Sequence, residues 1–152
     1  MKRQFGSFLS RLRWGGTTLS SLEFHLLQTL VEALPLHLRS VVSAQFDGYN
    51  LVQRESDGRA LNFYRKKDGG AEALTDLPVI DHKQREAPLV RITATIGESS
   101  EPLHAVLTAV NGRAFCISFN RRPSRLEQNA AIHVKRTVEA WRSNVFVPTN
   151  DA

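Results

Sequence analysis

The stretch Leu103–Phe119 reads LHAVLTAVNGRAFCISF, and it decides the fold class of this 152-residue chain. Alternating runs meet at Asn111-Gly112, the dipeptide that best fits a two-residue type I′ turn, so the stretch predicts a β-hairpin. Both faces of this hairpin carry apolar residues, which places it near the centre of a sheet. The two-residue turn predicts three pairs on one face: Thr108 with Phe115, Val106 with Ile117 and His104 with Phe119.

A second hairpin is predicted around Asp57-Gly58, between the strand-like runs 49–55 and 60–65. One face of this hairpin is apolar and the other is half polar, so the first is expected to join the core. The predicted pairs are Val52 with Phe63 and Arg54 with Leu61 on the core face, and Leu51 with Tyr64 and Gln53 with Asn62 on the outer face. We interpret the outer residues Gln53, Asn62 and Tyr64 as candidates for contact with a partner.

Two further segments complete the predicted sheet. Residues 89–96 alternate between apolar and polar side chains, with Val90, Ile92, Ala94 and Ile96 facing inward. Residues 74–80 are expected to form a short edge strand, because Pro78 cannot donate a backbone hydrogen bond in the centre of a sheet.

Helices are predicted before and after these strands. Ser20 and Glu23 form a capping box at the start of one helix, and Pro35 interrupts it. Residues 38–46 fit a second helix and also a strand period, and we favour the helix because no β-branched run is present. A second capping box, Ser124 to Glu127, predicts a C-terminal helix with Ala130, Val134, Val138 and Trp141 on one stripe.

These elements predict one α+β domain over residues 17–147. Its antiparallel sheet would have four to six strands, including the two tight hairpins, with N-terminal and C-terminal helices packed on one face. Residues 1–16 would form a basic amphipathic arm, and residues 148–152 a frayed tail. The chain length allows one core without disulfides or metals.

The arm at 1–16 carries an apolar stripe at helical spacing, followed by Gly15-Gly16. Either the stripe packs on its own domain, or it docks reversibly to a membrane surface or a partner groove. The absence of acidic residues before Glu23 also resembles an organelle transit peptide, whereas interrupting arginines exclude a secretory signal. The residues of the stripe are Phe5, Phe8, Leu9 and Leu12.

The sequence offers no signature of catalysis, of a metal site or of a cofactor. The five histidines lack metal-ligand spacing, and no glycine-rich phosphate loop is present. The single cysteine, Cys116, falls inside a predicted strand, where a thiolate would not be stabilised. A lone cysteine also fits a reducing compartment, so we expect a cytoplasmic protein and lean away from an enzyme.

Charge separates the candidate functions. Residues 1–13 and 121–142 each carry a net charge of +4, whereas residues 14–120 hold 10 basic and 12 acidic residues. The basic C-terminal region is the alternative, nucleic-acid-binding site, formed by Arg121, Arg122, Arg125, Lys135, Arg136 and Arg142. These residues spread over much of a helix surface, so we favour a protein-binding module: a small adaptor, immunity or assembly factor. Its partner is not expected to be strongly cationic, because a neutraliser of a basic protein would itself be acidic.

Overall fold

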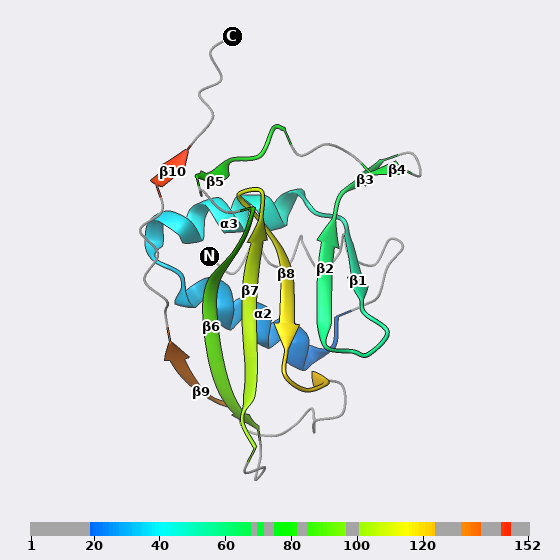
Figure 1. Cartoon of the computed structure of the whole chain (residues 1–152), viewed down its shortest axis with the longest axis vertical. Coiled ribbons are helices and arrows are strands. Elements are labelled where there is room, and N and C mark those ends of the chain that lie inside the picture. Colours follow the sequence, from blue (N-terminus) through cyan, green and yellow to red (C-terminus); the bar gives the residue numbers. More distant parts are fainter. Residues whose placement is uncertain are drawn as a thin grey trace.

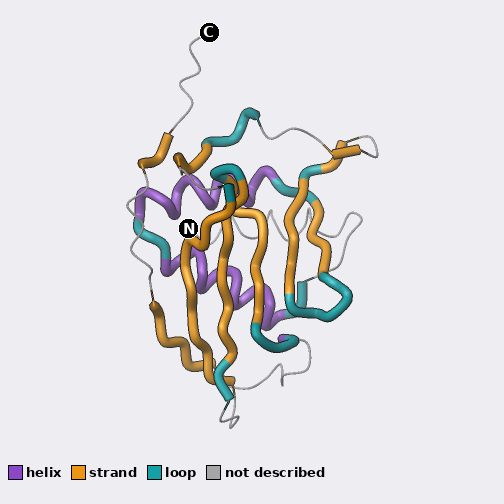
Figure 2. The backbone as a smooth tube through the Cα atoms, viewed as in Figure 1, coloured by secondary structure: helices purple, strands orange, loops and turns teal. Residues whose placement is uncertain are grey.

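Two helices and a six-stranded antiparallel sheet make up the main body of the protein in a computed structural model (Figures 1 and 2). The structure describes residues 19–67, 70–71, 75–81, 85–96, 101–123, 132–137 and 144–146. The helices are α2 (Ser21–Ala33) and α3 (Leu36–Gly48), and the sheet contains β1 (Leu51–Arg54), β2 (Ala60–Tyr64), β6 (Glu86–Ile96), β7 (Leu103–Val110), β8 (Arg113–Phe119) and β9 (Ile132–Thr137). The α+β class with an antiparallel sheet is therefore confirmed.

The sheet has the strand order β1-β2-β8-β7-β6-β9, and both helices lie against one of its faces (Figure 1). The core fills the space between these two layers. Helix α2 contributes Leu26, Leu27 and Leu30, all fully buried, and the sheet contributes residues such as Ile92 and Ile117. The sheet face toward the helices is thereby buried from water, as the alternation of apolar residues predicts.

The two N-terminal helices begin and end where the sequence signals them. Ser20 caps α2: its side chain accepts a hydrogen bond from the Glu23 amide, and the Glu23 carboxylate accepts one from the Ser20 amide. Pro35 separates the helices, since its ring fixes φ and leaves no amide to continue α2. The helical interpretation of residues 38–46 is confirmed by α3, which buries Leu38, Val42 and Phe46.

The first hairpin, β1–β2, has the register that the sequence predicts. Val52 lies opposite Phe63 and Gln53 opposite Asn62, and both Val52 and Phe63 are buried. The connection is longer than a two-residue turn, because the Gly58 amide donates to the Glu55 carbonyl and the Glu55 amide to the Ala60 carbonyl. The turn is longer than predicted by one residue on each strand, so every pair of the hairpin keeps its predicted register and face.

The central hairpin, β7–β8, turns at Asn111-Gly112, where both residues have positive φ as a type I′ turn requires. Its predicted pairing was wrong by one residue: Ile117 lies opposite Leu107, not Val106, and Phe119 opposite Ala105, not His104. The register shifts between the pairs Ala109–Ala114 and Thr108–Cys116. A β-bulge at Phe115 accounts for the shift, because one extra residue on β8 opposes β7 there.

The predicted C-terminal helix was wrong over residues 132–137, which form strand β9 at the edge of the sheet. The register sets Ile132 opposite Ile96 and Val134 opposite Ala94, two buried positions of β6. Pairing with β6 satisfies the backbone of a segment rich in β-branched residues, and this outweighs the local helical pattern. The capping box at residues 124–127 lies outside the described residues.

Short strands lie at the end of the sheet near the β7–β8 turn. Strand β5 (Val79–Asp81) pairs with β10 (Asn144–Phe146), and β3 (Lys66–Lys67) pairs with β4 (Gly70–Ala71). The predicted edge strand at 74–80 is thus confined to β5 and joins β10 instead of the main sheet. Its Ile80 is buried, and its amide donates to the Gly112 carbonyl in the turn below.

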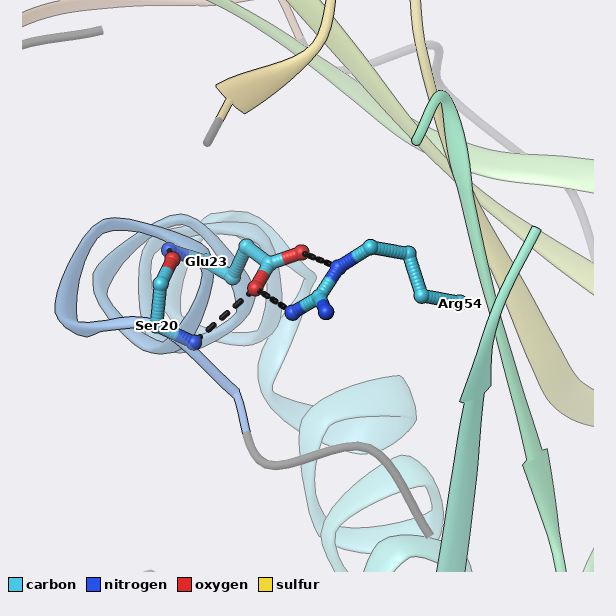
Figure 3. A network of polar contacts seen from close by, with 3 residues as sticks. All are labelled: Ser20, Glu23 and Arg54. Atoms are coloured by element: carbon cyan, nitrogen blue, oxygen red, sulfur yellow. Dashed lines mark hydrogen bonds and ion pairs between the residues drawn. The ribbon is translucent and has the colours of Figure 1, made fainter. Parts of the chain in front are cut away.

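A buried ion pair ties the start of α2 to β1 (Figure 3). The Glu23 side chain is fully buried, and both of its carboxylate oxygens accept from the Arg54 guanidinium, with Nε at 2.9 Å from Oε2. The hydrogen bond to Glu23 raises the pKa of Arg54, so the cation persists at all physiological pH. The same carboxylate therefore caps the helix and positions it on the sheet.

A second polar connection joins α3 to the β7–β8 turn. The buried Gln45 side chain donates to the carbonyls of Pro78 and Gly112 and accepts from the Ala114 amide, at 2.8, 3.0 and 2.9 Å. All three partners are backbone groups, of which the Gly112 carbonyl also accepts from the Ile80 amide. Gln45 thereby fixes the turn and the segment before β5 on the end of α3.

Candidate protein-interaction face

The sheet face away from the helices is the candidate functional site, and we call it the open face (Figure 1). No helix or strand of the described residues lies across it in this view. Its side chains are the half-buried or exposed positions that alternate with core residues along the strands. They include Gln53, Ala60, Asn62, Tyr64, Glu86, Pro88, Arg91, Thr93, Thr95, His104, Val106, Thr108, Val110, Arg113, Phe115, Cys116 and Ser118.

The structure brings the three predicted contact residues together. Gln53 on β1 lies opposite Asn62 on β2, and Asn62 lies opposite Cys116 on β8. Paired residues of an antiparallel sheet share a face, so these side chains form a row across three strands. Tyr64 lies two positions beyond Asn62 on the same face. Gln53 is exposed, and Asn62 and Tyr64 are half-buried.

Phe115 belongs to this site, although the sequence analysis did not name it as a contact residue. Ala114 and Ile117 are both fully buried, and the bulge leaves Phe115 and Cys116 between them, both half-buried on the outer side. The Phe115 ring meets the Tyr64 ring edge to face, with centroids 5.2 Å apart and planes at 84°. The one sequence signal is the spacing between Ala114 and Ile117, which is three positions where the alternation of a regular strand has two.

Polar groups and one carboxylate complete this part of the open face. The Asn62 amide donates to Oε1 of Glu55 at 2.6 Å. Burial, followed by the negative charges of Glu55 and Glu86, raises the pKa of the Cys116 thiol to about 11. The thiol is therefore neutral at physiological pH, which is the opposite of what a nucleophilic cysteine needs.

The far end of the open face is also polar. Thr93 Oγ1 and His104 Nδ1 lie 3.0 Å apart across β6 and β7. The His104 amide donates to Oδ1 of Asn120 at 2.7 Å, which holds the start of β7 to the residue after β8. Within the described ranges, no group of three or more His, Cys, Asp or Glu residues gathers as metal ligands would.

The basic residues do not form the predicted helical surface. Lys135 and Arg136 lie on strand β9, and Arg125 and Arg142 lie outside the described residues. Arg121 at the end of β8 is engaged with Glu101, to whose carboxylate and carbonyl it donates, while Arg122 packs beside Gly58. The two described residues of the predicted helix thus lie on a strand, and the nucleic-acid role of the six basic residues stays a prediction.

The arm residues Phe5, Phe8, Leu9 and Leu12 lie outside the described part of the chain, so their predicted contact role stays a prediction. Among the helices that the structure describes, none is long and apolar enough to cross a membrane.

Comparisons of the chain with protein-family models, with curated proteins and with solved structures find no match.

Proposed function

We propose that this chain is a non-catalytic protein-binding module, of the adaptor, immunity or assembly-factor type, that holds its partner on the open face. The observation that carries the proposal is the composition of that face. An antiparallel sheet can simply expose a polar face to water, and such a face would be dominated by charged and threonine-like residues. Here the middle of the face, on β2, β8 and β7, carries an aromatic pair, a valine, a cysteine and an asparagine amide beside Thr108 and Ser118.

The distribution of charge on the open face supports the same proposal. Its middle residues Asn62, Val106, Thr108, Cys116 and Ser118 are all uncharged. Charged side chains surround them, with Glu55 after the edge strand β1, Glu86 and Arg91 on β6, and Arg113 at the start of β8 beside the turn. Protein interfaces have this anatomy, in which charged residues are depleted at the centre and tyrosine and phenylalanine are enriched.

The test is affinity capture from nuclease-treated lysate with two matched variants of the full chain. Gln53→Arg with Ser118→Arg places two cations on the open face, and His37→Arg with Ser40→Arg places two on exposed positions of α3. All four positions are exposed, so both variants should keep the fold, which far-UV circular dichroism checks.

We expect the wild type and the α3 variant to retain one stoichiometric protein that the open-face variant loses. Retention should survive moderate salt, unlike binding to a phosphate backbone. Equal retention by both variants, or capture that requires intact nucleic acid, would contradict the proposal.

A further inference from the structure

One corner of the open face carries a carboxylate, Glu55, that pairs with no cation in the ion pairs recorded between the described residues. Glu55 is exposed and directly follows β1, and its Oε1 is held by the Asn62 amide. The ion pairs between described residues join Arg54 to Glu23, Arg65 to Asp76 and Arg121 to Glu101. Glu55 takes part in none of these described pairs.

The negative charge of Glu55 reaches the middle of the open face. Burial, then the charge of Glu55, raises the pKa of Tyr64, and the Cys116 thiol responds to Glu55 and Glu86 in the same direction. Two groups on neighbouring strands thus lie within reach of the Glu55 charge, which the hydrogen bond from Asn62 holds beside them. A partner with complementary charge would present a cation there.

The aromatic pair specifies the shape of that cation. The edge-to-face arrangement of Tyr64 and Phe115 keeps both rings half-buried at the surface, so part of each ring is available to a ligand. A guanidinium is planar, stacks on aromatic rings and offers a fork of donors to a carboxylate, whereas an ammonium is a compact, strongly hydrated charge. Arginine therefore matches this corner better than lysine.

We propose that the partner segment on the open face inserts an arginine side chain beside Glu55 and over the Tyr64–Phe115 pair. This inference rests on the proposed function and names the chemistry of its partner. A single arginine at this corner is compatible with a partner that is not strongly cationic as a whole. The Asn62 hydrogen bond orients the Glu55 carboxylate, and the β-bulge at Phe115 supplies the second ring.

The single cysteine of the chain lies beside this corner and allows a direct test on the full chain. Cys116 is half-buried on the open face, and its Cα partner on β2 is Asn62. The protein is equilibrated at pH 9 with equal amounts of bis(2-guanidinoethyl) disulfide and its neutral isostere, bis(2-ureidoethyl) disulfide. The Cys116 thiolate attacks one sulfur, forms a mixed disulfide and releases the other half as a thiol. Intact-mass spectrometry then gives the ratio of the two adducts.

We expect the guanidino adduct to exceed the ureido adduct by about two- to fivefold, the range of an exposed ion pair. Glu55→Gln keeps an acceptor for Asn62 and should remove the preference, whereas Glu32→Gln, the same change on exposed α2, should leave it intact. Equal adducts in the wild type, equal effects of the two variants, or no adduct from either disulfide would overturn the inference. Loss of capture by the open-face variant alongside equal adducts would refute arginine recognition alone and leave the protein-binding proposal standing.

Discussion

Replacing Arg54 with methionine tests how α2 is anchored on the sheet. The Glu23 side chain is fully buried, and Arg54 provides its cation and two of its hydrogen bonds (Figure 3). Methionine retains much of the volume of the arginine stem but leaves the carboxylate without a counter-charge. Breaking a buried pair from one side costs about 3 to 5 kcal/mol. Since 27% of the Arg54 side chain is exposed and water can replace part of it, we expect about 3 kcal/mol.

The double variant separates the buried charge from lost packing. Glu23→Gln removes the charge while an amide oxygen can still accept from the Ser20 amide. In Glu23→Gln with Arg54→Met no uncompensated charge remains, so we expect it to be more stable than Arg54→Met alone by about 1 to 2 kcal/mol. Urea unfolding followed by far-UV circular dichroism measures all four proteins. If Arg54→Met cost less than about 0.5 kcal/mol, or the double variant were the least stable, the anchoring argument would be refuted.

Three further changes test other parts of the account. Gln45→Leu removes three hydrogen bonds to the backbone and leaves the Pro78 carbonyl and the Ala114 amide without this partner, so it should lower the free energy of unfolding by roughly 3 kcal/mol, measured by urea titration. Gly112→Ala should destabilise more than Gly58→Ala in the same assay. Both glycines have positive φ, but only at Gly112 would a methyl group run into the Ile80 carbonyl, and equal losses would contradict this. The rate of Cys116 alkylation by iodoacetamide should rise about tenfold per pH unit up to about pH 10, because the pKa of the thiol is about 11. A plateau of this rate near pH 9 would contradict the raised pKa.

The fold was predictable wherever a local signal and the core agreed. The capping box at Ser20, the break at Pro35 and the alternation in residues 90–96 each placed an element correctly, because each depends on neighbours in sequence. The first hairpin kept its register despite a longer turn, since the apolar Val52 and Phe63 can reach the core in one register only.

The errors arose where distant pairing decides the local structure. Residues 132–137 carry a helical stripe, yet they pair with β6 as a strand. The local sequence does not show that the edge of the sheet at β6 is free to accept another strand. The bulge at Phe115 inserts one residue and so moves the rest of β8 by one position relative to β7, which a turn dipeptide alone does not reveal.

The candidate site was predicted in part for the same reason. Gln53, Asn62 and Tyr64 follow from the β1–β2 register, which is local. Phe115 and Cys116 join them only because β8 pairs with β2 and bulges at that level. The sequence predicts two hairpins but not which of their strands are neighbours in the sheet. The Tyr64–Phe115 contact depends on β2 lying next to β8.

The most direct test of the central claim is site-specific photo-crosslinking in the native lysate. Benzoylphenylalanine is placed at Gln53 on the open face or at His37 on the helix side, both exposed positions of the full chain. If the open face holds a protein partner, irradiation will give one discrete adduct from position 53 and none from position 37, with or without nuclease. An adduct from position 37 alone, or none from position 53, would contradict the account.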